Sequence, residues 1–129
     1  MKSTRLILLA LYLSNFLYGC ASVADIRNSP PRFQGQFQGN YSKAARCVAD
    51  KMQEDDRWSI KRLQYNVRVY PDIETSEIQA YASSAYTGAI YAFILTLKQV
   101  NKESIEGVLK GSEFSSGIAW KYLNACTNK

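Results

Sequence analysis

The chain has 129 residues, of which 47% are hydrophobic and 12% aromatic, and this composition excludes a disordered or collagen-like protein. It contains no histidine, which removes Ser-His and Cys-His catalytic pairs and the commonest metal ligand. The net charge of +5 falls to +3 when Lys2 and Arg5 are set aside. Because the other basic residues are interleaved with acidic ones, we expect no nucleic-acid partner.

Residues 1–19 have the layout of a secretory signal. Lys2 and Arg5 precede an apolar run, Leu6–Leu17, and the segment ends at the small residue Gly19. The apolar run has about twelve residues, whereas a transmembrane helix needs roughly twenty. We therefore predict that residues 1–19 are a signal peptide that directs export.

The end of this segment carries a more specific motif, Leu17-Tyr18-Gly19-Cys20. The motif resembles the lipobox of bacterial lipoproteins, in which the cysteine becomes the lipid-modified first residue, although a small residue is more usual in place of Tyr18. The resemblance implies that Cys20 is the lipidation site and carries acyl chains such as palmitate. Since Ala21 rather than aspartate follows, it also implies an outer-membrane lipoprotein that faces the periplasm. The inner membrane or the cell surface is the alternative location.

An ordinary thiol at the end of an uncleaved signal is the other interpretation of Cys20.

Residues 20–40 are predicted to be a flexible tether, because they contain a proline pair, two glycines and three glutamines. When extended, such a tether would reach about 66 Å and let the domain stand off the membrane. Phe33 and Phe37 in the near-repeat FQGQFQG either dock on the domain, which we favour, or contact a partner.

The folded periplasmic domain is predicted to span residues 41–129 and to begin with a helix. Ser42 is a candidate N-cap, and the apolar residues that follow recur at helical spacing: Ala45, Val48, Ala49 and Met52. Polar and apolar residues then alternate in residues 60–71 and again in residues 76–82, which is typical of half-buried antiparallel strands.

Two further strands and a second helix complete the predicted order. Residues 88–100 are the most apolar part of the domain, which favours a central strand, with a buried helix as the alternative. Residues 104–111 are predicted to form a shorter strand. The last helix would begin at Ser115 or Ser116, and its inward face is predicted to carry Ile118, Tyr122 and Cys126.

The order helix, four strands, helix predicts an α+β fold. A four-stranded antiparallel sheet flanked on one face by the N-terminal and C-terminal helices gives a two-layer sandwich that buries all the apolar stripes together.

The cysteine count bears on the same arrangement. If Cys20 is lipidated, Cys47 and Cys126 remain as an even pair in an oxidising compartment, which predicts a disulfide. The bond would join the two helices side by side over the sheet. Two buried free thiols are the alternative. We expect no metal site, because the cysteines lack the close spacing of zinc ligands.

We find no catalytic constellation in the sequence and expect neither enzyme activity nor a cofactor. Glu54, Asp55 and Asp56 lack the spacing of a calcium loop and are expected to form a solvated turn. No two of the remaining carboxylates are singled out as a hydrolase pair. Three tyrosines of the strand region are candidate partner contacts, although tyrosine also suits a half-buried sheet: Tyr65, Tyr81 and Tyr91.

These features together predict a lipid-anchored envelope lipoprotein, whose non-catalytic periplasmic domain binds a protein partner or supports an envelope assembly. The membrane would be contacted through the anchor at Cys20. The alternative is a lipoprotein that binds a small molecule or a glycan in a tyrosine-lined pocket between the sheet and the helices.

Overall fold

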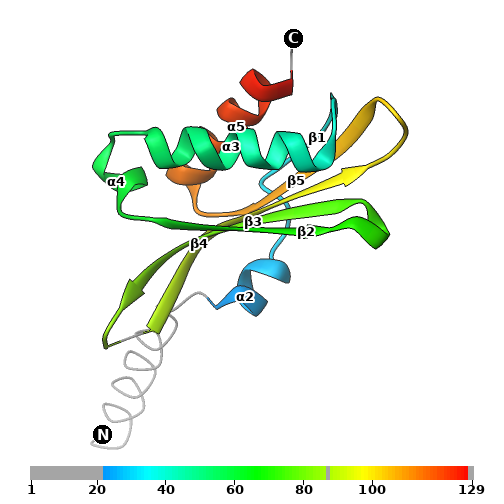
Figure 1. Ribbon diagram of the computed structural model, residues 1–129. Coiled ribbons are helices and arrows are strands. Elements are labelled where there is room, and N and C mark those ends of the chain that lie inside the picture. The colour runs from blue at the N-terminus through cyan, green and yellow to red at the C-terminus, as the bar shows by residue number, and fades with distance from the viewer. Residues whose placement is uncertain (1–21, 87, 128–129) are drawn as a thin grey trace, which may run out of the picture.

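The computed structural model describes residues 22–86 and 88–127, so the predicted signal peptide and Cys20 lie outside the described residues. The elements are α2 (Val23–Arg27), β1 (Phe33–Gln38), α3 (Tyr41–Glu54), α4 (Trp58–Lys61), β2 (Gln64–Tyr70), η2 (Pro71–Ile73), β3 (Thr75–Ser84), β4 (Gly88–Gln99), β5 (Ser104–Gly111) and α5 (Glu113–Thr127). Within this part of the chain, five strands form one antiparallel sheet in the order β1-β5-β4-β3-β2. Helices α3 and α5 cover one face, and α2 lies against the other (Figure 1).

The predicted α+β class and the antiparallel sheet are confirmed, but the sheet has five strands instead of four. The additional strand, β1, pairs with β5 at the edge of the sheet, with Phe37 opposite Ile105. Its sequence alternates Phe, Gly and Phe with three glutamines, so one side of the strand is apolar while the composition is that of a linker. Phe37 is buried in the core, which confirms docking on the domain.

The expectation of a flexible tether over residues 20–40 is corrected by α2 as well as by β1. Ser22 caps α2 and forms a reciprocal capping box with Asp25. Ile26 is buried, and the Arg27 guanidinium makes two hydrogen bonds, of 2.9 and 2.6 Å, to the carboxylate of Glu77 on β3. These partners lie 50 residues apart in the chain, which is why linker-like composition concealed them.

The core lies between the sheet and the pair of helices α3 and α5. The backbone amides of Ser42 and Lys43 donate to the side chain of Asn40, so α3 is capped by Asn40 rather than by the predicted Ser42. The apolar stripe of α3 and one side of α5 meet the inward-facing residues of the strands. The fully buried side chains include Val48, Met52, Ile78, Phe93, Leu95, Leu97, Ile105, Leu109 and Leu123.

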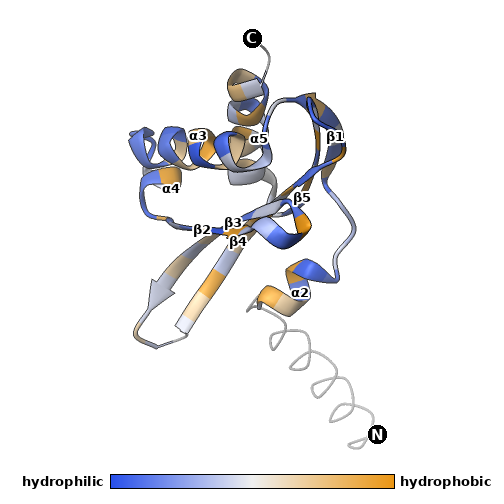
Figure 2. Cartoon of the chain, turned by 45° about the vertical axis from the view of Figure 1, so that its right-hand side comes forward, coloured by the Kyte–Doolittle hydropathy of each residue, from blue (hydrophilic) through white to orange (hydrophobic). Residues whose placement is uncertain are grey.

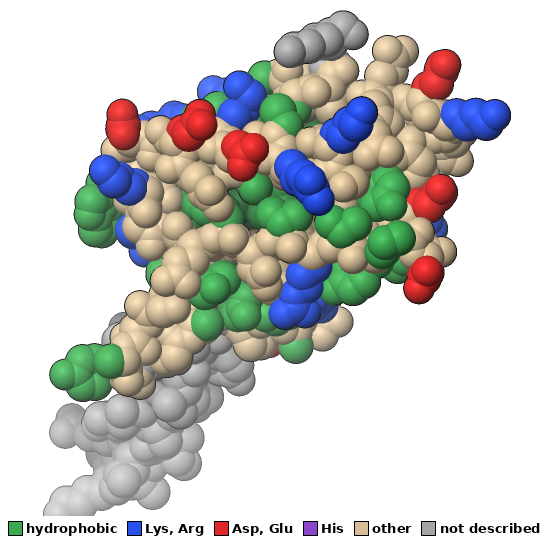
Figure 3. Space-filling model, viewed as in Figure 1, with side chains coloured by type: hydrophobic (Ala, Val, Ile, Leu, Met, Phe, Trp, Pro, Cys, Tyr) green, Lys and Arg blue, Asp and Glu red, His purple; other side chains and the backbone are tan. Residues whose placement is uncertain are grey.

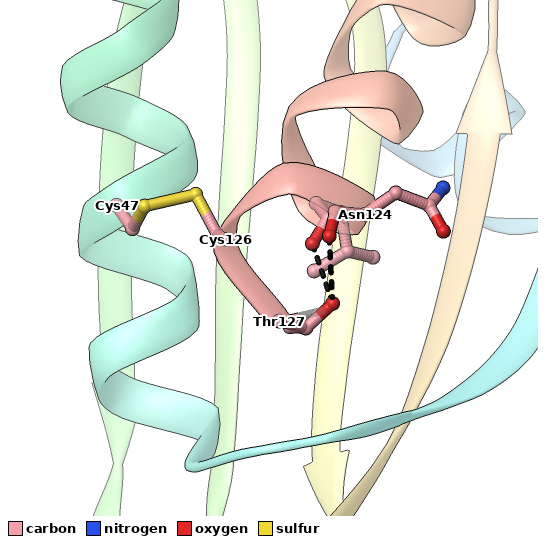
Figure 4. Close-up of a disulfide and its surroundings, with 5 residues drawn as sticks. Cys47, Asn124, Cys126 and Thr127 are labelled. Carbon is pink, nitrogen blue, oxygen red and sulfur yellow. Dashed lines mark hydrogen bonds between the residues drawn. A yellow bond between two sulfur atoms is a disulfide. The ribbon is translucent and has the colours of Figure 1, made fainter. Parts of the chain in front are cut away.

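The predicted disulfide is confirmed. Cys47 on α3 and Cys126 on α5 are joined with a Cα–Cα distance of 6.0 Å (Figure 4). Next to the bond, the hydroxyl of Thr127 donates to the carbonyl of Leu123 at 2.7 Å and ties down the last turn of α5. The bond therefore links the first long helix to the last, and these two helices pack side by side over one face of the sheet.

Strand β4 is the predicted central strand, and a β-bulge divides it. The pairing of Ala80 with Phe93 changes to a pairing of Tyr81 with Tyr91, which leaves Ala92 as the extra residue. Gly111 on β5 has a φ of +138° and approaches the bulge so closely that a Cβ there would lie 2.3 Å from the Ala92 carbonyl oxygen. Only glycine fits this position without movement of the backbone.

Beyond the bulge, β3 and β4 continue as a two-stranded ribbon, which we call the β3–β4 arm and define as residues 81–86 and 88–91. Figures 1 and 2 show that the arm extends past the rest of the sheet on the side of α2. In the described part of the chain, no helix is long and apolar enough to cross a membrane.

Candidate functional site

A groove with a volume of about 690 Å³ lies between β1 and α5 and opens to solvent. Its lining is mainly aromatic and aliphatic with two cationic side chains, and consists of Phe33, Arg57, Phe114, Gly117, Ile118, Trp120 and Lys121. A volume of this size falls in the range of ligand-binding sites, roughly 300 to 1,000 Å³.

Phe33 and Trp120 line the groove, and the buried ring of Phe37 packs beneath them. Phe33 stacks on Trp120 with 5.4 Å between the ring centroids, and Phe37 meets the same indole edge-on at 5.1 Å. Both phenylalanines point to the same side of β1 because they are four residues apart on a strand. Such ring pairs hold each other in fixed orientations, so the floor is rigid. Phe114, at the start of α5, is 59% exposed and adds a free aromatic surface at one end.

One cation of the groove, Arg57, is held in place by Asp55. The Nε and Nη2 atoms of Arg57 donate to the Asp55 carboxylate at 2.9 and 2.5 Å, and the Tyr122 hydroxyl donates to it from α5 at 2.5 Å. The hydrogen bonds from Arg57, followed by that from Tyr122, hold the pKa of Asp55 well below its usual range. The bond to Asp55 raises the pKa of Tyr122.

The burial of Asp55 corrects the expectation that Glu54, Asp55 and Asp56 form a solvated turn. Glu54 and Asp56 are exposed, but the side chain of Asp55 is only 5% exposed. Its partner Tyr122 is 67 residues away, so no local pattern could identify it. Among the described residues, no group of three side chains is arranged to hold a metal ion.

The second cation, Lys121, is exposed on α5. Because the charge of Arg57 is compensated by Asp55, Lys121 supplies the net positive charge at the rim of the otherwise apolar groove. The Asp55 carboxylate accepts hydrogen bonds from both Arg57 and Tyr122. An anionic group on a bound partner would therefore find favourable charges at this rim.

The three tyrosines predicted to contact a partner do not share one surface. Tyr65 lies on the helix side of the sheet, where it packs against the core and donates to the Ile60 carbonyl at 2.8 Å. Burial raises the pKa of Tyr65 to about 12. Tyr81 and Tyr91 lie together at the base of the β3–β4 arm, with 5.5 Å between their ring centroids. Their role as partner contacts stays a prediction.

The groove residues on α5 were not singled out from the sequence, although a signal was present. Phe114, Gly117, Ile118 and Lys121 are spaced at i, i+3, i+4 and i+7, which places them along one side of a helix. The stripe of Ile118, Tyr122 and Cys126, which the sequence predicts to face the core, shares Ile118 with this side of α5.

No protein-family model, curated protein or solved structure matches the chain.

Proposed function

We propose that the chain is a lipid-anchored envelope lipoprotein whose non-catalytic domain binds a protein partner in the periplasm. The motif that ends at Cys20 supports the anchor. The disulfide between Cys47 and Cys126 supports the compartment, since such bonds persist in oxidising environments such as the periplasm. One acyl chain binds a membrane marginally, whereas the two or three that lipoproteins carry give a stable anchor.

The observation that supports protein binding best is the open aromatic groove between β1 and α5. Aromatic and arginine side chains dominate the binding energy of protein interfaces, and Phe114, Trp120 and Arg57 bring these types together. The floor is already ordered by ring packing, so little conformational entropy would be lost on binding.

The lining also favours one kind of partner segment. A bulky apolar side chain would cover the rings of Phe33 and Phe114, and a neighbouring carboxylate would face Arg57 and Lys121. We therefore propose that the partner presents a short acidic segment with an apolar anchor residue.

A small-molecule or glycan ligand is the second candidate, favoured by the volume of the groove. Such a ligand would bind in the groove between β1 and α5, and not in the tyrosine-lined pocket between sheet and helices that the sequence predicts. Buried side chains such as Met52 and Phe93 fill the space between sheet and helices, and none of the described tyrosines lines the groove.

Site-specific photocrosslinking in cells tests the proposal. A crosslinker in place of Phe114 should capture one defined protein, and Lys121→Glu in the same chain should reduce the capture several-fold because it reverses a rim charge. A crosslinker in place of Ile73, which is equally exposed on η2, is the matched control and should capture none of that protein.

Equal capture from positions 114 and 73, or capture that Lys121→Glu leaves unchanged, would contradict binding through the groove. Failure to capture any protein, together with saturable binding of a small molecule that Phe114→Ala abolishes, would favour the second candidate.

A further inference from the structure

The chain contains no charged residue between Glu77 and Lys98, and the β3–β4 arm lies in the middle of this stretch. The arm is nevertheless exposed, with Tyr86 99% and Ile90 36% accessible to solvent. Figure 3 shows hydrophobic and neutral atoms along the arm on the face in view, whereas charged side chains are spread over the rest of that face. Tyrosine is enriched at membrane–water interfaces, where its amphipathic ring sits at the level of the headgroups.

Among the described strands, the two strands of the arm pair only with each other beyond Tyr81. Pairing with β2 ends at Tyr81, opposite Gln64, and pairing with β5 ends at Phe93, opposite Gly111. Only two strands continue from there, and a two-stranded hairpin is marginally stable by itself in water. Contact with a second surface would stabilise the arm.

Helix α2, which follows the proposed anchor closely in the sequence, lies at the same side of the molecule. One residue separates Cys20 from Ser22, the cap of α2, and two residue steps span about 7 Å at most. Helix α2 is held against the sheet by Ile26 and by the Arg27–Glu77 ion pair. Tyr91 of the arm lines the same shallow pocket as Asp25 and Ile26 of α2.

We infer that the β3–β4 arm contacts the headgroup region of the bilayer that holds the lipid anchor, with Tyr86 at the point of contact. This inference rests on the proposed lipidation of Cys20. A phenol ring suits this layer because its body is apolar and its hydroxyl can bond to water and headgroups. The arm has no charge, so the contact does not require anionic lipids.

Two attachments, the lipid at Cys20 and the arm, would fix the orientation of the domain. Helices α3, α4 and α5 lie on the side of the sheet opposite α2, as Figure 1 shows. The groove between β1 and α5 is on this helix side and would face away from the membrane, where a periplasmic partner can reach it.

Fluorescence quenching by brominated lipids tests the contact. The mature lipidated protein carrying Tyr86→Trp is reconstituted into phosphatidylcholine vesicles with brominated or ordinary acyl chains. The emission added by Y86W should be lost mostly in the brominated vesicles, and this loss should be the same at high salt. Wild-type protein gives the background from Trp58 and Trp120.

Tyr70→Trp is the matched control, because Tyr70 is exposed at the other end of the sheet, where β2 ends. Its added emission should be unchanged by bromine. The acylation of each sample is read by intact mass. An acylated protein whose Y86W emission is not quenched, or is quenched only with anionic lipid, would overturn the inference and leave the anchor standing. Equal quenching of Y70W would overturn the orientation, and an unacylated protein would overturn the anchor and the inference together.

Discussion

Asp55 joins three separate parts of the molecule at the level of single side chains. Its carboxylate follows the last turn of α3, orients Arg57 at the rim of the groove, and accepts the hydroxyl of Tyr122 on α5. The network therefore couples the position of a groove cation to the packing of the two helices. A buried carboxylate whose hydrogen bonds are satisfied in this way is most stable in its charged form.

We predict an acid-dependent loss of stability that is centred on Asp55. Hydrogen bonds lower the pKa of Asp55 below its unfolded value of about 3.9, so its contribution is fully present above that pH. It is lost as the pH falls through the lower pKa of the folded state. Asp55→Asn should lower the free energy of unfolding at pH 7 and give a shallower decline below about pH 4.

Urea unfolding at a series of pH values measures this effect. Asp56→Asn changes an exposed neighbour and should follow the wild-type curve. A free-energy difference between Asp55→Asn and wild type that is the same at pH 7 and pH 2 would contradict the role of the carboxylate.

At the level of helices and strands, local periodicity predicted most of the fold. Alternation identified β2 and β3, apolar content identified β4, and helical spacing identified α3 and α5. Elements fixed by distant contacts were missed, because β1 and α2 have linker-like composition and are held by partners on β5 and β3. The groove was missed for the same reason, since it forms only when β1 packs against α5.

The disulfide between α3 and α5 should make a large contribution to stability. It closes a loop with a sequence separation of 79, and bonds of this kind typically contribute about 2 to 4 kcal/mol. We expect the double variant Cys47→Ala/Cys126→Ala to lose about that amount of unfolding free energy in guanidinium titrations.

A reducing agent should lower the stability of wild type by a similar amount and leave the double variant unchanged. If wild type and the double variant unfolded at the same denaturant concentration under oxidising conditions, the helices would be held together without help from the bond.

For the whole molecule, the packing of α2 on the sheet shortens the segment that could act as a tether between Cys20 and the domain. A tether of residues 20–40 would let the domain stand well away from the bilayer, whereas Ser22 already caps helix α2, which packs on the sheet. A domain attached so closely through the proposed lipid at Cys20 would keep one side toward the membrane. The groove and α2, whose cap Ser22 is two residues from the proposed anchor, lie on opposite sides of the sheet.

The proposed anchor at Cys20 underlies the location, the orientation and the oxidising environment of the domain. Intact mass and membrane fractionation of the expressed protein, with Cys20→Ala beside wild type, test it most directly. We predict that wild type begins at Cys20, carries acyl chains and sediments with membranes, while Cys20→Ala carries none and leaves the membrane fraction. Wild-type protein without acyl chains, or a Cys20→Ala variant still attached to membranes, would contradict the account.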